Sequence, residues 1–264
     1  MRGFRRAAAA FARRDLQVGL SYKLPFVLEI LGSVFALLTV WFVARLIDPR
    51  LVPGGYFPFV VVGLLVSAFV DSGVNALGGS IRQEQLTGTL EATLASGLPS
   101  AALAVGMAAY PTVSAVFGAV VYGVLAAILG ARAPDANWSL SLCAIVLGAV
   151  AFAGLGLVGA AIVLVVRRAS AAIGWLVAAL GLGAGEFFPP RLLPGWVQGL
   201  AALSPFTWCL RLVRAAVLEG AGWSQSWTDL LVLAAMAIAF TLLGMGALVL
   251  GLRHARRTGS LGQY

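Results

Sequence analysis

Long apolar runs separated by short polar breaks are the feature that most limits what this chain can fold into. About 20 apolar residues suffice for a helix to cross a hydrocarbon core of about 30 Å. Of the 264 residues, 61% are hydrophobic and only 11% are charged, too little polar surface to enclose a water-soluble globule. The sequence therefore predicts an all-α membrane protein with six transmembrane helices: about residues 24–47, 57–80 and 100–129, a fourth from about 139 to Arg167–Arg168, a fifth that begins almost at once and runs to about 188, and a sixth at about 229–252.

Residues 1–23 precede the first run and are basic and amphipathic. Phe4, Phe11 and Val18 fall on one side of a helix, and arginines fall opposite. This pattern is typical of a helix lying flat on an anionic membrane surface, and a targeting or disordered tail is the alternative. The rest divides into a transmembrane domain at 24–257 and a C-terminal tail at 258–264.

The basic residues predict the orientation of the chain. The net charge is +8, but its sources lie at the ends of apolar runs, which argues for a membrane protein and against nucleic-acid binding. Two simple loops on one side carry only Arg50 and Arg132. The other side, with both termini, is predicted to be cytoplasmic because it collects Arg2, Arg5, Arg6, Arg13, Arg14, Lys23, Arg82, Arg167, Arg168, Arg253, Arg256 and Arg257.

The longest polar interruption, RQEQLTGTLEATLASGLP at 82–99, lies between the second and third runs. Its leucines recur every four residues and share one face of a helix, and Gly97 with Pro99 gives a stop signal. Gly88 allows the chain to bend after the preceding membrane helix. We expect a short amphipathic helix at about 84–97 on the cytoplasmic surface, whose polar face includes Arg82, Glu84, Gln85 and Glu91.

A second irregular region covers about residues 188–226. It contains FFPP at 187–190, LPGW at 193–196 and SPFT at 204–207, and the apolar pieces between these breakers are too short to cross the bilayer. Backbone at membrane depth is tolerated only where protein buries it or water reaches it. We expect short re-entrant helices that close the outer end of a pathway, and an ordinary structured loop is the alternative.

These two regions resemble type-2 ATP-binding-cassette (ABC) transporter permeases, the transmembrane subunits of many bacterial exporters. In that family the cytoplasmic elbow is a coupling helix that docks on a separate ATPase, which implies contacts through Glu84, Gly88, Thr89, Leu90, Glu91 and Leu94. An unrelated interfacial helix is the alternative. The elbow departs from the family where it reads TLASG at 93–97 instead of a leucine pair followed by Thr-Pro, so the details of docking are open.

The resemblance implies a partner that hydrolyses ATP with Mg, because this chain has no GxxxxGK[ST] sequence and Lys23 is its only lysine. It also implies a second permease subunit, in a homodimer or heterodimer, surrounded by membrane lipids in a bacterial inner membrane. The implied cargo is hydrophobic or amphipathic: a drug, a lipid or a lipid-linked glycan. No HExxH or GxSxG sequence is present, and we expect no catalytic residue, metal site or cofactor within the chain itself.

Charged residues inside the runs are the remaining functional candidates. Asp71, with Asn75 four residues on, lies inside the second run, where an isolated carboxylate must face protein or water. Three roles are open for Asp71: it lines the pathway, it is protonated, or it makes a structural hydrogen bond with a neighbouring helix. Glu186 ends the fifth run, and we expect it to pair with Arg191, Arg211 or Arg214 as a latch on the outer gate.

Two other functions are compatible with this pattern. A channel or an ion-coupled secondary transporter would use Asp71 and need no ATPase. A membrane scaffold or immunity protein would bind a partner and move nothing.

Overall fold

The computed structural model describes residue 13 and residues 23–47, 52, 54–86, 100–165 and 169–258. In this part of the chain the regular structure is helical, which confirms the predicted all-α class. The elements are α2 (Lys23–Ala44), α3 (Tyr56–Leu86), α5 (Ser100–Ile128), α6 (Trp138–Val165), α7 (Ala169–Ala184), the 3-10 helix η2 (Pro190–Leu192), α8 (Gly195–Ala201), α9 (Pro205–Leu218) and α10 (Trp223–Thr258).

Within the described residues, three helices are long and apolar enough to cross a membrane: Tyr56–Val74 in α3, Trp138–Val163 in α6 and Trp223–Arg253 in α10. A fourth candidate is the pair α8 and α9, which meet at an angle of 92°. The apolar segments Ile30–Ala44, Thr112–Ile128 and Ala172–Ala184 are shorter. Three to four spans are thus supported, and the six-span arrangement stays a prediction.

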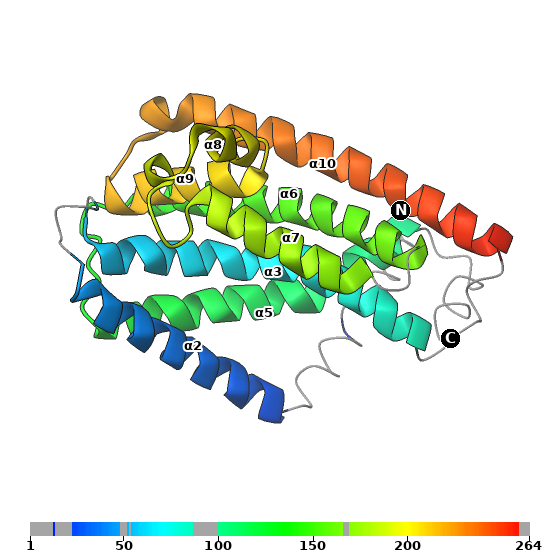
Figure 1. The fold of residues 1–264 in the computed structure, drawn as a ribbon, viewed down its shortest axis with the longest axis horizontal. Helices are drawn as coiled ribbons and strands as arrows, with labels where there is room; N and C mark the ends of the chain where they lie inside the picture. Colours follow the sequence, from blue (N-terminus) through cyan, green and yellow to red (C-terminus); the bar gives the residue numbers. More distant parts are fainter. Residues whose placement is uncertain are drawn as a thin grey trace.

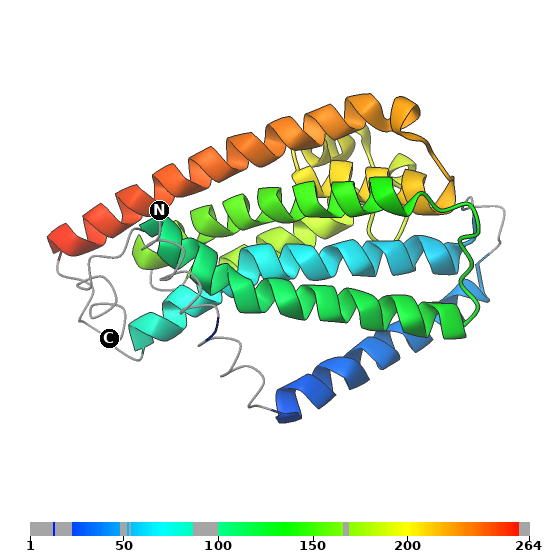
Figure 2. The same ribbon diagram turned by 180° about the vertical axis from the view of Figure 1, so that it is seen from behind.

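The long helices run side by side along one axis, and α8 and α9 gather at the end where α10 begins (Figures 1 and 2). Helix α3 is central, since it packs against α2, α5, α6, α7 and α9. The main core contains Phe152 of α6 and Phe206 of α9, whose rings meet edge to face at 6.1 Å. Large apolar side chains such as Phe35, Trp175 and Leu242 are exposed, as expected for a surface that faces lipid.

Helices α6 and α10 approach closely at two glycines. A Cβ on Gly154 would lie 2.5 Å from the carbonyl carbon of Phe240, and a Cβ on Gly244 would meet the carbonyl oxygen of Gly154. Membrane helices gain packing and weak hydrogen bonds where small residues let their backbones meet. Gly154 and Gly244 therefore allow α6 and α10 to pack backbone against backbone.

The region after α7 forms short helices, as the breakers in the sequence predict. At the break between α8 and α9, Ser204 caps α9 by accepting a 3.2 Å hydrogen bond from the Phe206 amide. The Thr207 hydroxyl and the Trp208 indole donate to the carbonyls of Ala201 and Ala202, at 2.6 and 2.8 Å. These bonds satisfy carbonyls that the end of α8 leaves open, so the SPFTW sequence encodes the corner.

The predicted elbow begins differently from the expectation. Helix α3 continues without interruption to Leu86, so residues 84–86 of the predicted coupling helix extend α3. Residues 87–99 lie outside the described residues. The same holds for the tail at 259–264 and for the predicted surface helix at 1–23, apart from residues 13 and 23.

Candidate functional site

A buried carboxyl group lies where α3, α7 and α9 meet. Glu186 is 9% exposed, and its Oε1 accepts a 2.8 Å hydrogen bond from the Ser67 hydroxyl of α3. Burial of a carboxylate is costly unless hydrogen bonds or opposite charges compensate it. The Ser67 contact therefore joins the turn after α7 to the middle of α3.

The turn that carries Glu186 is built by a glycine. Gly185 has a φ of +81°, and the amides of Gly185 and Glu186 donate to the carbonyls of Leu182 and Gly181, both at 3.1 Å. This is a Schellman motif, which ends a helix with a left-handed residue that is usually glycine. The motif turns the chain at the end of α7 and brings Glu186 against α3.

Two further glycines make the space that Glu186 occupies. A Cβ on Gly181 of α7 would lie 2.6 Å from the Glu186 carboxylate, and a Cβ on Gly63 of α3 would collide with the Glu186 carbonyl oxygen. Any larger residue at these positions would push the turn away from α3. The lack of side chains at Gly63 and Gly181 therefore makes room for Glu186.

Arg214 of α9 holds the same turn from the other side. Its guanidinium donates to the carbonyls of Gly185 at 2.8 Å, Glu186 at 3.0 Å and Phe59 of α3 at 3.1 Å, and it stacks 3.4 Å from the centre of the Phe59 ring. The side chain is buried, and its Nε has no hydrogen-bond partner. One planar cation therefore links α3, α9 and the turn after α7. We call Phe59, Gly63, Ser67, Glu186 and Arg214 the Glu186 cluster.

The structure separates the arginines that were expected near Glu186. Arg214 approaches it through main-chain carbonyls, whereas Arg211 makes a 2.9 Å salt bridge with Asp229 of α10. The two arginines are three positions apart on α9 and therefore neighbours on one side of it, but the Arg211 side chain is 63% exposed and Arg214 is buried. Both line a partly polar cavity of about 570 Å³ between α7, α8, α9 and α10.

Asp71 lies one helical turn from Ser67 on α3. The Asp71 side chain is exposed and has interactions of its own. Asn75 is on α3, but its side chain lies outside the described residues.

Sequence reasoning missed Gly63, Ser67 and Phe59. A signal for two of them was present, since Gly63, Ser67, Asp71 and Asn75 are spaced by four residues and so follow one stripe along α3. Of the predicted coupling residues, Glu84 lies in the last turn of α3 with its side chain undescribed, and Gly88, Thr89, Leu90, Glu91 and Leu94 lie outside the described residues.

Long apolar helices around a few buried polar contacts, with large apolar side chains facing outward, define a multi-pass helical membrane protein. The profile of the ABC-2 type transporter family matches residues 11–218, which end with α9. Because the match covers most of the chain, the protein belongs to the ABC-2 type transporter family. It is a transmembrane permease component and not the ATPase, and the family implies association with an ABC ATPase subunit. No curated relative matches the chain.

Proposed function

We propose that this permease subunit works in an ATP-driven exporter that moves a hydrophobic or amphipathic cargo across a bacterial inner membrane. The observation that carries the proposal is the family match over residues 11–218. The partner ATPase supplies the ATP and Mg chemistry, and this chain supplies the route. The apolar helices agree with a drug, a lipid or a lipid-linked glycan as cargo.

Force from the partner enters through the elbow at 84–97 and travels along α3. Helix α3 has 31 residues and is therefore about 46 Å long. Its last turn leads into the elbow, and its first half carries Phe59, Gly63 and Ser67 of the Glu186 cluster. A rigid shift of α3 is therefore transmitted to the turn after α7 and to α9.

The Glu186 cluster serves as the latch of the outer gate. Its hydrogen bonds join α3, α9 and the turn that precedes η2 and α8, so these elements separate only when those bonds break. The cluster is buried and largely paired, which favours two discrete arrangements over continuous deformation. The latch opens when the elbow drives α3 away from the turn.

A complete exporter contains two permease subunits, as a homodimer or a heterodimer, that enclose the route between them. Both termini face the cytoplasm. The clustering of basic residues at one set of run ends supports this orientation.

The test is reconstitution of the full chain with its ATPase partner in proteoliposomes. Uptake of fluorescent amphipathic cargoes is followed with ATP, without ATP and with a partner whose Walker lysine is replaced. We expect uptake only with ATP and the intact partner. Gradient-dependent uptake without the ATPase would instead identify an ion-coupled transporter, for which the exposed carboxylate of Asp71 is the candidate group.

A further inference from the structure

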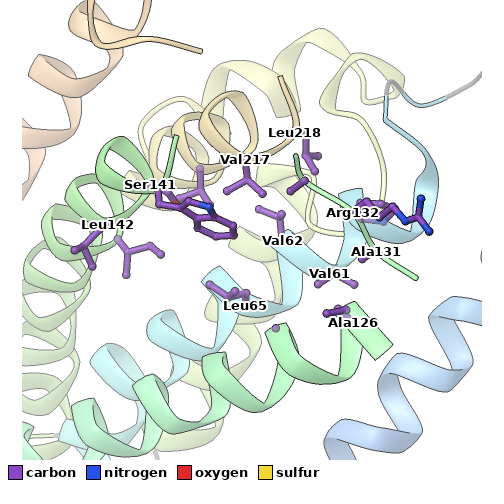
Figure 3. Close-up of a pocket in the computed structure, with 17 residues that line it drawn as sticks. Val61, Val62, Leu65, Ala126, Ala131, Arg132, Ser141, Leu142, Val217 and Leu218 are labelled. Atoms are coloured by element: carbon purple, nitrogen blue, oxygen red, sulfur yellow. The ribbon is translucent and has the colours of Figure 1, made fainter. Parts of the chain in front are cut away.

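A long apolar groove separates α5 from α6 in the described part of the chain. Both helices pack against α3, but they hardly touch each other. A cavity of about 360 Å³ occupies one end of the groove, between α3, α5, α6 and α9 (Figure 3). A second cavity of about 540 Å³ continues it along the same helices, since Leu65, Leu142 and Ile145 line both.

The groove has the length of a lipid chain. Its lining on α5 extends from Thr112 to Ala127, which corresponds to about 22 Å along a helix. One leaflet of the hydrocarbon core is about 15 Å deep. A lipid acyl chain that enters from one membrane surface can therefore lie in the groove over its whole length. Each of the two cavities also has a volume typical of sites that bind small ligands.

The groove has exposed charged and aromatic residues at the end formed by the α5–α6 loop. Along most of its length the lining is aliphatic, with small residues such as Gly123, Ala126 and Ala149 making the space. At the end formed by the α5–α6 loop, Arg132 and the Trp138 indole are exposed beside the cavity. Figure 3 shows Arg132 at the edge, next to Ala131, with Val61, Val62 and Leu65 along α3. Exposed tryptophan and arginine are typical of the headgroup level of a membrane.

We propose that this groove binds one acyl chain of an anionic phospholipid, with the headgroup phosphate on Arg132. Within a bilayer, an apolar surface gives a second protein helix no hydrophobic advantage over lipid, so helix pairs need small residues where their backbones meet. The rims of this groove instead carry branched side chains, including Val116, Val120 and Val146, which are about half exposed. The guanidinium recognises the phosphate through parallel N–H donors. The proposal is independent of the exported cargo and of the ATPase.

The test compares the lipid retained by matched variants of the full chain. The chain is purified from vesicles of phosphatidylcholine with phosphatidylglycerol, and bound lipids are counted by native mass spectrometry. Gly123→Leu fills the groove without a clash, because a Cβ there meets nothing within 4 Å. Gly32→Leu on α2 is the control, since Gly32 is exposed like Gly123, a Cβ there also meets nothing within 4 Å, and it lies outside the groove lining.

We expect Gly123→Leu to lose one retained lipid per chain and Gly32→Leu to keep it. Arg132→Gln should reduce the preference for phosphatidylglycerol over phosphatidylcholine about fivefold, as expected for one arginine near the surface. Arg45→Gln is its control, because Arg45 directly follows the end of α2, which lies at the same end of the bundle as the start of α6 (Figure 1), and stacks on Trp41 outside the groove. If Arg132→Gln kept the preference for phosphatidylglycerol over phosphatidylcholine, the proposed binding of the headgroup phosphate by Arg132 would be wrong.

Equal lipid retention in Gly123→Leu and wild type would overturn the acyl-chain site. Loss of a dimer in that variant, with the lipid count unchanged, would show that a second copy covers the groove and would also overturn it.

A second measurement uses the wild-type chain and so does not depend on the folding of any variant. Phosphatidylglycerol with a photoreactive diazirine on its chain should crosslink to α5 and α6 within the groove, and unlabelled lipid should compete. Crosslinks spread evenly over the lipid-facing helices would contradict the proposal.

Discussion

The Ser67 hydroxyl donates a 2.8 Å hydrogen bond to Oε1 of Glu186, which lies 119 residues later in the chain. This bond connects the helix that leads to the predicted coupling elbow with the turn that leads to the short helices α8 and α9. Together with the bond from Arg214 to the Phe59 carbonyl, it ties α3 to the turn after α7 and to α9.

Replacing Glu186 by Gln keeps an oxygen that accepts from Ser67 but removes the charge. A hydrogen bond to a charged group contributes about 1 kcal/mol more than a neutral one. We expect slower ATP-driven transport and a small shift of the thermal unfolding midpoint in detergent. Asp135→Asn makes the same chemical change in an exposed loop and serves as the control. If Glu186→Gln changed neither transport nor stability, the proposal that Glu186 latches the outer gate would be contradicted.

Replacing Arg214 by Lys breaks the three-carbonyl clamp, because an ammonium group lacks the planar fork that reaches Gly185, Glu186 and Phe59 together. Carbonyls left unpaired at a buried site cost about 1–3 kcal/mol each, so the free energy of unfolding should fall by at least about 2 kcal/mol. Arg211→Lys is the matched control. Arg211 makes an exposed salt bridge, so that change should cost less than about 1 kcal/mol. Equal losses in the two variants would contradict the clamp.

Replacing Gly63 by Ala introduces a methyl group against the Glu186 carbonyl oxygen. Overpacking of this kind costs about 1–3 kcal/mol, and the rigid backbone on the other side leaves little room to adjust. We expect a lower unfolding midpoint and weaker transport. Gly79→Ala, on the same helix with nothing within 4 Å, should instead raise stability by up to about 1 kcal/mol through helix propensity. A stabilising effect at both glycines would show that α3 and the turn are not in close contact.

Replacing Glu91 by Lys reverses a charge on the predicted polar face of the elbow. We expect the partner ATPase to co-purify less with the permease, while membrane insertion and the yield of permease stay unchanged. Asp135→Lys makes an equivalent charge reversal in the exposed loop between α5 and α6, which lies at the end of the bundle away from the end of α3 (Figure 1), and should keep the partner bound. A Glu91→Lys complex with full coupled activity would count against docking at the elbow.

Local rules predicted much of the fold. The apolar runs predicted helices, and the boundaries of α2, α6 and α7 lie within a few residues of the expected ones because helix ends follow from nearby breakers. Within the SPFT breaker, Ser204 is the N-cap of α9 and Pro205 its first residue, positions that these residue types favour. Helix α10 begins at Trp223, six residues before the predicted run, because the polar residues before Asp229 still form helix when α10 packs on α9.

The candidate site was less predictable. Glu186 and Arg214 could be selected from the sequence because charge is rare within apolar runs. The contact between them could not be predicted, because the Arg214 guanidinium binds main-chain carbonyls, and every residue has one whatever its side chain. Arg211 and Arg214 lie one turn apart on α9, yet Arg211 pairs with Asp229 of α10 and Arg214 binds the turn after α7, and only helix packing decides which partner each one reaches.

The sequence by itself determined that this is a membrane protein, where its helices lie along the chain and which family it resembles, because hydrophobicity, charge and helix breakers act over short distances along the chain. Only the tertiary structure decided which side chains meet. Ser67, Glu186 and Arg214 are brought together because Gly63, Gly181 and Gly185 let three backbone segments approach one another, and such an approach depends on the packing of all the helices around α3. The groove between α5 and α6 arises in the same way, since each helix packs on α3 and neither fills the space between them.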